Sequence, residues 1–457
     1  MSRFTQLALA VIVGLGLTIG GLSVALARLG PAVDTLSTAS TIDGTLVETQ
    51  IALTFTQPMR IPSVERAFRL EPRTPGAFSW SGNEMLFTPS KSLRYSQAYN
   101  LTVGTRAVSA SGHRLQHAFS ASFTTQGRHL LYLGTAGVER GHLVLATLTG
   151  RRQVVDDGSG HVTGYAVSPD HSLVVYAKKG SSGERSDELW LINLADNSAQ
   201  MVFRRPAWNM TEPHLSPDNR YIVFLATDVL ICRQYEHCYS DTSSPLVYFF
   251  DLNVRRVFPF KSQSDVPITN FIDFSPAGQI AYTDLGSALV TADPNGNHVV
   301  HIPNSGNALE YQGFDPNGDK AVFVGQTPSS SGGDILMYTK NGYVDISHGV
   351  YDSSTPSFSN SGGRVAYAGY RGEQGIEPIY GINEYDLRTR RTRRLAIPAG
   401  WTDWSPRWSL DDRYVAWVRM QPQEAMYLGS GEVWAARADG KDAHPLGAIG
   451  RDVSWVS

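Results

Sequence analysis

The sequence predicts an all-β protein, and three observations support this class. Short stretches of alternating apolar and polar residues are separated by turn-forming residues, with 43 glycines and 24 prolines in 457 residues. Stretches with helical periodicity are few. From about residue 128 onward, short patterns recur 40 to 59 residues apart. The composition, 42% hydrophobic and 18% charged, is that of a globular chain able to bury a core.

The first 30 residues differ from the rest of the chain. Leu7 to Ala27 contains no charged residue, and its length matches the ~20 residues that cross a bilayer as a helix. We expect residues 1–30 to form a single-pass transmembrane anchor that leaves the bulk of the chain extracytoplasmic. The small residues at Ala25 and Ala27 also suit a signal peptidase, so a cleaved signal segment and a secreted protein are the alternative.

The chain has two cysteines, Cys232 and Cys238, in the stretch ICRQYEHCYS. In an exported protein such a pair is expected to form a disulfide that closes a small loop. His237 lies beside them, but two cysteines and one histidine lack a fourth ligand at the usual zinc spacing. We therefore expect a disulfide, with free thiols or a metal as alternatives, and no cofactor.

Residues 31–126 predict a small β-sandwich. TQIALTFTQPM places Ile51, Leu53 and Phe55 on one face of a strand, and EMLFTPS, AYNLTVG and FSASFTT repeat the period-two pattern. The stretches LTFTQPM, LFTPSKSLRYSQAYNLTV and GHRLQHAFSASFTT resemble the SbsA-type bacterial Ig-like domain. In that family the module is a spacer or interaction domain and carries no chemistry.

Residues 127–457 contain six turns with one layout. Each turn begins with a small or acidic residue, here called the turn-opening residue: Ser168, Ser216, Ser275, Asp315, Ser359 and Ser409. Their spacing is close to the ~40 to 50 residues of a four-stranded propeller blade. An apolar residue precedes each one, and an aromatic residue follows eight positions later, or seven for Tyr282. A second tight turn in each repeat, such as NLADNSAQ, completes four strands.

The C-terminus supplies part of another repeat. Ser457 lies 48 residues after Ser409, so DVSWVS reads as an inner strand without its three companions. HLLYLG, GHLVLATL and RRQVV, from His129 onward, read as those companions. We therefore expect a β-propeller closed by the C-terminal strand, with seven blades favoured and six as the alternative.

The SPD turn followed by an apolar run and an aromatic resembles TolB-like propellers, relatives of the WD-repeat family. That resemblance implies the fold and not a function. The TolB type has six blades, whereas the repeats here favour seven. Asp315, Asn360 and Leu410 also depart from the S-P-D letters, although each still belongs to a turn.

Candidate ligand-binding residues lie near the expected ring axis and on one rim. His214, Asp273 and Arg407 each stand two residues before a turn-opening residue in an inner strand, where polar groups either contact a ligand or form a hydrated lining. Trp401 and Trp404 are expected in the loop before the last inner strand, where exposed aromatics suit a peptide or a sugar.

Two further motifs have simpler interpretations. The run RTRRTRR is expected to form an exposed hairpin, with binding of an anionic polymer or lipid headgroups as the alternative; its arginines are Arg388, Arg390, Arg391, Arg393 and Arg394. DPNG occurs at Asp293 and Asp315 and superficially suggests a calcium loop. Both copies fall where the repeat requires a turn, so we expect no metal site.

The function predicted from these features is binding and not catalysis. The chain has neither a GxSxG nucleophile motif nor an HExxH metal motif. Its net charge of −3 gives no reason to expect nucleic acid as a partner. We expect a membrane-anchored cell-envelope protein whose propeller binds a protein, peptide or glycan. The alternatives are a propeller-type glycan lyase or hydrolase, and a structural subunit of an envelope assembly.

Overall fold

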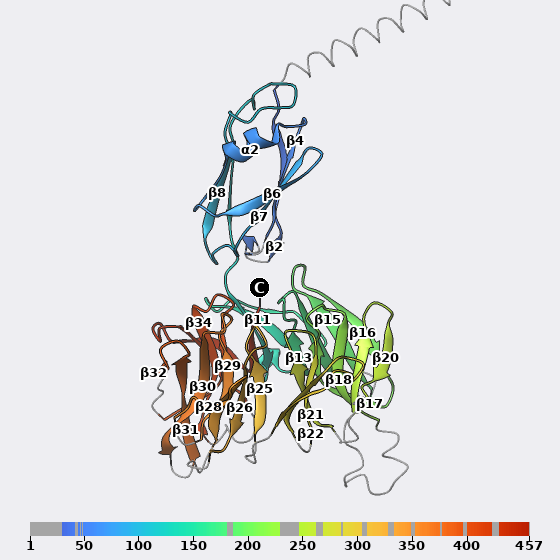
Figure 1. The fold of residues 1–457 in the computed structure, drawn as a ribbon, viewed down its shortest axis with the longest axis vertical. Helices are drawn as coiled ribbons and strands as arrows, with labels where there is room; N and C mark the ends of the chain where they lie inside the picture. Colours follow the sequence, from blue (N-terminus) through green and yellow to red (C-terminus); the bar gives the residue numbers. More distant parts are fainter. Residues whose placement is uncertain are drawn as a thin grey trace, which may run out of the picture. The chain divides into compact units, whose positions relative to one another are not determined.

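The structure is a computed structural model, and the chain divides into two compact units, Met1–Gly127 and Arg128–Ser457, which we describe separately (Figure 1). The described residues are 30–41, 44–45, 47, 49–180, 186–228, 246–261, 268–284, 287–303, 309–327, 333–348, 352–374, 377–395, 400–422 and 429–456. Almost all of the expected membrane anchor, Cys232, Cys238 and Ser457 lie outside them. Within these ranges, no helix combines the length and the apolar character needed to cross a membrane.

The first unit is the expected sandwich of two antiparallel sheets. One sheet has the order β1 (Val33–Ser37), β4 (Ile51–Phe55), β7 (Glu84–Pro89), β6 (Gly76–Ser81), and the other β5 (Phe68–Glu71), β8 (Ala98–Val103), β9 (Phe119–Thr124). The short strands β2 (Ser40–Thr41) and β3 (Gly44–Thr45) pair with each other, and α2 (Ile61–Ala67) precedes β5. Ile51, Leu53 and Phe55 are fully buried, which confirms the alternation read from the sequence.

In the described part of the second unit, five sheets have four antiparallel strands each, numbered consecutively from the innermost outward. They are β13 (Val162–Val167), β14 (Leu173–Lys179), β15 (Asp187–Asn193), β16 (Ser198–Arg204); β17 (Trp208–Leu215), β18 (Tyr221–Asp228), β19 (Leu246–Asp251), β20 (Arg256–Pro259); β21 (Ile268–Phe274), β22 (Ile280–Asp284), β23 (Ser287–Ala292), β24 (Val300–Pro303); β25 (Glu310–Phe314), β26 (Ala321–Gly325), β27 (Asp334–Thr339), β28 (Gly342–Asp345); β29 (Ser354–Phe358), β30 (Arg364–Gln374), β31 (Glu377–Asp386), β32 (Arg391–Arg394). This is the propeller-like arrangement expected from the repeats.

A sixth sheet joins the two ends of the unit. Its order is β12 (Arg152–Val154), β11 (Leu143–Thr147), β10 (His129–Gly134), β36 (His444–Val456), β35 (Gly431–Arg437), β34 (Tyr414–Met420), β33 (Thr402–Trp408), and η1 (Gly137–Glu139) links β10 to β11.

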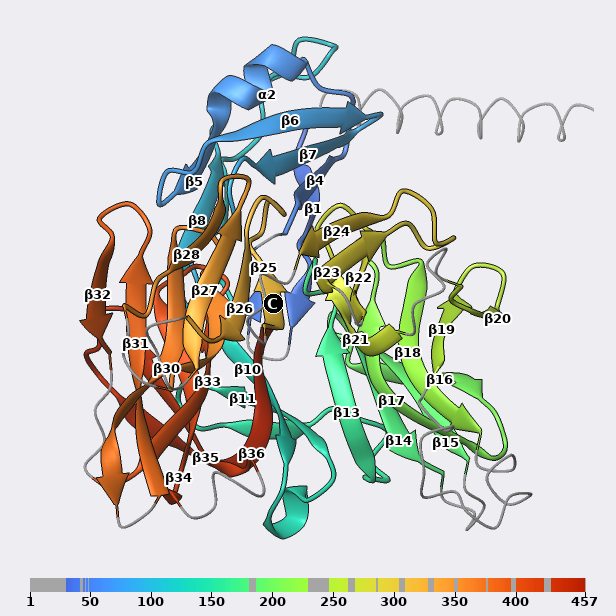
Figure 2. The same ribbon diagram turned by 60° about the horizontal axis from the view of Figure 1, so that its bottom comes forward.

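The strand β36 belongs to two blades (Figure 2). Its first half pairs with β35, and its last residues pair with β10 in the register His129 to Val456 and Leu130 to Trp455. If the sixth sheet is divided at β36, the described residues form seven four-stranded blades. The pairing of β10 with β36 is the one that the incomplete C-terminal repeat predicts.

The turn-opening residues are buried, and their side chains form hydrogen bonds within the turn that follows. The Ser168 hydroxyl donates to Asp170 Oδ1 at 2.6 Å and accepts the backbone N–H of Leu173 at 2.9 Å. The same acceptor contact recurs in three other turns, for Ser216 with Tyr221, Ser359 with Arg364 and Ser409 with Tyr414. Where Asp315 replaces serine, its carboxylate accepts the N–H of Lys320 at 2.7 Å. The departures from S-P-D therefore preserve a turn.

The aromatic residues that follow these turns fill the cores between blades. Tyr176, Phe224, Tyr282, Phe323, Tyr367 and Trp417 are all 0% exposed, and so is Tyr132 in β10. Each lies in the second strand of its blade, where it packs between two sheets. The spacing of these aromatics is therefore a property of blade packing.

Candidate ligand site at the ring axis

Bulges in the inner strands set the direction of the candidate site residues. In β17, β29 and β33 two residues of the inner strand lie opposite one residue of its neighbour. The first residue of each bulge has a positive φ and is followed by proline: Glu212-Pro213, Thr355-Pro356 and Ser405-Pro406. Proline donates no hydrogen bond to a ladder, so it is tolerated at such a bulge. His214, Ser357 and Arg407 come directly after the three prolines.

Two predicted site residues meet across neighbouring blades. His214 of β17 and Asp273 of β21 approach to 3.4 Å between Nδ1 and Oδ1. Their side chains are 25% and 50% exposed, so this pair is accessible to solvent. Asp273 Oδ1 also accepts the N–H of Phe274 at 2.7 Å, which fixes the carboxylate.

Tyr311 of β25 extends this group to a third inner strand. Burial raises the pKa of its hydroxyl well above the usual value, and the charge of Asp273 raises it further. Among the described residues, this buried hydroxyl has no hydrogen-bond partner. Tyr311 could not be identified from the repeat positions, because it lies four residues before Asp315 and the β25 bulge changes the register.

Arg407 belongs to a second polar group, whose other members are Tyr165 and Asp452. Burial lowers its pKa, and the neighbouring Asp452 and Tyr165 oppose that effect. Tyr165 lies in β13 and Arg407 in β33, and β36, which carries Asp452, belongs to the blade between them. Side chains from non-adjacent inner strands can interact in this way where they point toward the ring axis. Arg407 belongs to the inner strand β33, and no contact joins it to His214 or Asp273 in the described structure.

Hydrogen bonds to backbone carbonyl oxygens position Tyr165 and Arg407 of this second group. The Tyr165 hydroxyl donates to the carbonyl oxygens of Leu131, at 2.9 Å, and Asp452. Arg407 Nη1 donates to the carbonyl oxygen of Pro406 at 3.0 Å, the one bond of its guanidinium among the described residues.

The two predicted rim tryptophans have different environments. Trp401 precedes β33 in the connecting segment and is 41% exposed, as expected. Trp404 does not lie in that loop: it is a half-buried residue of β33, and its ring packs edge-on against Tyr380 with centroids 4.9 Å apart. The error arose because the strand begins earlier than the apolar pattern indicated.

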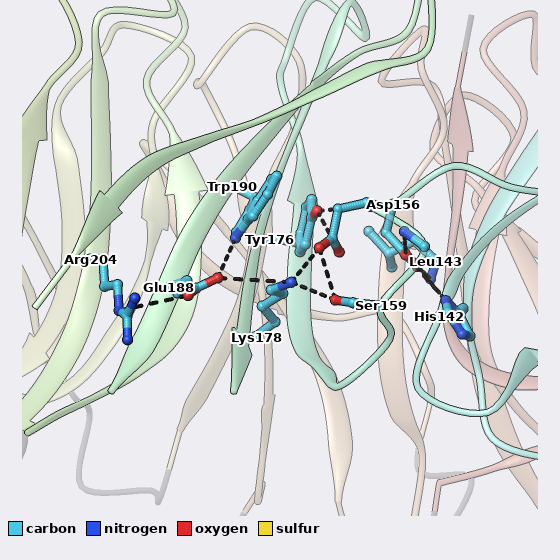
Figure 3. Close-up of polar contacts among 11 residues, drawn as sticks. His142, Leu143, Asp156, Ser159, Tyr176, Lys178, Glu188, Trp190 and Arg204 are labelled. Atoms are coloured by element: carbon cyan, nitrogen blue, oxygen red, sulfur yellow. Dashed lines mark hydrogen bonds and ion pairs between the residues drawn. The ribbon is translucent and has the colours of Figure 1, made fainter. Parts of the chain in front are cut away.

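A third polar group, which the sequence analysis missed, lies between the first two blades (Figure 3). Lys178, at the end of β14, is 5% exposed and contacts Asp157, Ser159 and Glu188. Its ammonium also lies 4.6 Å from the centre of the Trp190 ring, and the Trp190 indole donates to Glu188 at 2.9 Å. Every charge here is compensated, so the group fixes the segment between β12 and β13 to β14 and β15 and does not form a ligand site.

Blade seven repeats this arrangement. Arg419 lies 3.9 Å from the centre of the Trp434 ring, whose indole donates to Glu432 at 2.8 Å, and its guanidinium forms a bidentate pair with buried Asp403. The sequence signal is a cation two residues after the buried aromatic, with Glu-x-Trp in the next strand. It occurs as YAK with ELW and as WVR with EVW.

The arginine run and the DPNG motifs are found at turns and edges. All five arginines are exposed, and Arg391–Arg394 form the outer strand β32, where Arg393 pairs with Glu384 at 2.8 Å. The Asp293 carboxylate accepts the N–H groups of Asn295 and Asn297 within its own turn. Over the described residues, no three His, Cys, Asp or Glu side chains are grouped as metal ligands would be.

The fold thus defines an Ig-like domain followed by a propeller. Residues 28–125 match the bacterial Ig-like domain family, as the sequence stretches indicated. No curated protein matches the chain.

Solved structures with a similar fold include TolB from Acinetobacter baumannii, at 14% identity over 85% of this chain and 83% of that one, with a TM-score of 0.41. Another is the putative TolB from Agrobacterium tumefaciens, at 16% identity over 57% of this chain and 94% of that one, with a TM-score of 0.39. A third is oligogalacturonate lyase from Vibrio parahaemolyticus, at 14% identity over 62% and 80% of the two chains, with a TM-score of 0.45. Likeness at this level carries no information on activity or ligand.

Proposed function

We propose that this protein is a membrane-anchored, extracytoplasmic binding protein whose seven-bladed propeller holds a protein or peptide partner at the ring axis. The observation that supports this best is the position of Arg407. A guanidinium is a strong donor to carboxylates, and this one is half-buried, belongs to the inner strand β33 and forms one hydrogen bond within the described structure. The favoured partner therefore presents a carboxylate to Arg407.

The His214–Asp273 pair adds a carboxylate to the proposed binding site, in addition to the Arg407 cation. Asp273 is 50% exposed and attracts donors, whereas Arg407 attracts acceptors. A peptide carries both kinds of group along its backbone and side chains. The Ig-like unit would then act as a spacer between the membrane anchor and the propeller.

The test is peptide binding to the full-length protein. A library of acidic peptides and its matched amide library, with Gln and Asn in place of Glu and Asp, are screened against wild type and Arg407→Gln. We expect acidic peptides to bind and R407Q to weaken them at least ~10-fold, equivalent to about 1.4 kcal/mol.

The matched control is Arg388→Gln, which removes an exposed arginine from the β31–β32 hairpin and should leave binding unchanged. Equal binding of the acidic and amide libraries, or equal loss in R407Q and R388Q, would show that the axis does not recognise the partner through Arg407.

A second candidate function is a glycan lyase or hydrolase at the same axis, favoured by the contact between His214 and Asp273. A histidine oriented by a carboxylate can transfer protons. A hydrolase and lyase screen of purified protein distinguishes the two: activity that is lost in His214→Ala and Asp273→Asn supports the enzyme, and no turnover supports the binding protein.

A further inference from the structure

Two arginines of blade six lie beside the same buried amide. Arg371 is the extra residue of the bulge in β30, it is half-buried, and its Nη2 donates to Asn383 Oδ1 of β31. Arg394 of β32 is exposed and lies directly opposite Asn383 in the ladder. Directly opposite residues project from the same face of a sheet, with Cβ atoms about 4.5–5.5 Å apart. Both arginines therefore adjoin Asn383, which is 2% exposed.

The two guanidinium groups repel each other. Burial lowers the pKa of Arg371, and the charge of Arg394 lowers it further. The second hydrogen bond of the Arg371 guanidinium is to the carbonyl oxygen of Tyr370, at 3.4 Å, and its Nε is buried without a partner in the described structure. The side chain of Arg394 forms no hydrogen bond or ion pair with any described residue.

The described carboxylates around this pair have other partners. Glu373 accepts a tyrosine hydroxyl of its own strand at 3.3 Å. Glu384 projects from the opposite face of β31 and pairs with Arg393 at 2.8 Å. Asp345 of β28, whose charge acts on Tyr367, accepts two backbone N–H groups of its own turn, at 2.9 and 3.0 Å. The two arginines therefore have no counter-ion among the described side chains.

From this arrangement we propose that Arg371 and Arg394 bind a phosphate group, either free phosphate or a phosphate monoester. A phosphate monoester carries a charge of about −1.5 to −2 at neutral pH, so it balances two cations, whereas a carboxylate balances one. The planar guanidinium forms paired hydrogen bonds to phosphate oxygens, for which arginine is better suited than lysine. Gly369 supports the geometry, because a side chain there would overlap the Asn383 amide that holds Arg371.

This site is separate from the axial groups and from most of the arginine run. Arg394 lies in the outer strand β32, whereas Asp273 and Arg407 lie in inner strands. Arg391 and Arg393 project from the other face of β32, because side chains alternate along a strand. The run RTRRTRR thus contributes one arginine to the site, and β30 contributes the other.

The experiment measures binding of inorganic phosphate and of glycerol 3-phosphate to the full-length protein by calorimetry, at constant ionic strength in a phosphate-free buffer. We expect at least one of them to bind saturably, acetate to bind at least ~10-fold more weakly, and Arg394→Gln and Arg371→Gln each to weaken phosphate binding at least ~10-fold. Tighter binding of inorganic phosphate than of the ester identifies the free anion as the ligand, and the reverse order identifies a phosphorylated molecule.

Arg391→Gln is the matched control, because Arg391 is exposed in the same strand but projects from the opposite face. It removes the same charge and should leave phosphate binding unchanged. Thermal unfolding of each variant checks that the fold is intact, and R394Q, which alters an exposed residue, tests the proposal even if R371Q does not fold. The proposal is wrong if neither phosphate ligand binds saturably, if acetate binds as tightly, if R394Q binds phosphate like wild type, or if R391Q weakens binding as much as R394Q.

Discussion

At the scale of single residues, Lys178 is the clearest case of a charge held for structural reasons. It is nearly buried, and three polar side chains surround its ammonium. Removing one partner of a buried ion pair leaves an uncompensated charge and typically costs about 3–5 kcal/mol. Because both Asp157 and Glu188 keep some contact with solvent, we expect the lower end of that range for Lys178→Ala.

Denaturant unfolding of the propeller tests this value. Arg204→Ala is the internal control, because Arg204 contacts the same Glu188 at 3.7 Å but is 39% exposed. Its loss should cost less than about 1 kcal/mol. Similar decreases in unfolding free energy for Lys178→Ala and Arg204→Ala would mean that burial of the cation does not determine how much its contacts contribute to stability.

The contacts of Lys178 also predict how the unfolding free energy depends on pH. Burial alone would raise the pKa of Asp157, but Lys178 and Ser159 outweigh burial and hold it below the usual value. Arg128 lowers the pKa of Asp411 in the same way against the effect of burial. A carboxyl group with a lowered folded-state pKa contributes stability above its unfolded pKa of about 3.9, and this is lost as pH falls through the folded-state value.

We therefore expect the unfolding free energy of the propeller to fall as the pH decreases below about 4. Lys178→Met should show a shallower decrease, because its Asp157 no longer has the lowered pKa. Unfolding curves between neutral and strongly acidic pH measure both slopes. A variant slope as steep as that of wild type would contradict the assignment of this effect to the Lys178 contact.

At the scale of elements, the turn-opening serines are predicted to stabilise each blade individually. Ser216 is 3% exposed, and its hydroxyl accepts the N–H of Tyr221 and donates to Asp218. Ser216→Ala leaves a buried N–H without its acceptor, which costs about 1–3 kcal/mol. The expected result is a lower unfolding midpoint with an unchanged denaturant slope, and an unchanged midpoint would show that the turn does not need the hydroxyl.

The turns could be predicted from the sequence because their chemistry is local. A serine, its aspartate two residues later and an aromatic eight residues later all belong to one short segment, so their order survives in the sequence. The bulges are equally local, and Pro213, Pro356 and Pro406 mark them, but one proline inside an apolar run also suits the end of a strand. Trp404 was misplaced for a related reason, since strand ends are weakly encoded.

The candidate site could be predicted only in part, because it depends on contacts between blades. Equivalent repeat positions identified His214 and Asp273, and adjacent blades bring them to 3.4 Å. Tyr311 joins them through a bulge that shifts its register. The hydrogen bond from Tyr165 to the carbonyl oxygen of Asp452 and the electrostatic influence of both residues on Arg407 require the ring to close, because closure brings together residues nearly 300 positions apart.

At the scale of the whole molecule, the two ends of the propeller depend on each other. Arg128, the first residue of the unit, forms a bidentate pair with Asp411 in the last blade and lies 4.7 Å from the centre of the Tyr414 ring. Trp455 donates its indole N–H to the carbonyl oxygen of Arg407 at 2.9 Å. The first blade therefore has contacts with the last one both through strand pairing and through side chains.

Deletion of residues 450–457 should unfold the propeller as a whole instead of fraying one end. The deletion removes the inner strand of the first blade, with Val453, Trp455 and Val456 each at most 4% exposed. Burial of such side chains contributes about 1.5–3 kcal/mol each, so three of them approach the ~5–15 kcal/mol that stabilise a typical domain. The loss also exposes the edge of β10, which would then be free to pair with other chains.

Calorimetry of the full-length and truncated proteins tests this prediction. We expect the cooperative transition of the propeller to disappear, while the transition of the Ig-like unit, which has its own core, stays in place. Substitution of Ile449, which is 49% exposed in the first half of β36, by threonine is the control for a change in the same strand. If the truncated protein keeps a propeller transition at the temperature of the full-length protein, β36 does not close the ring.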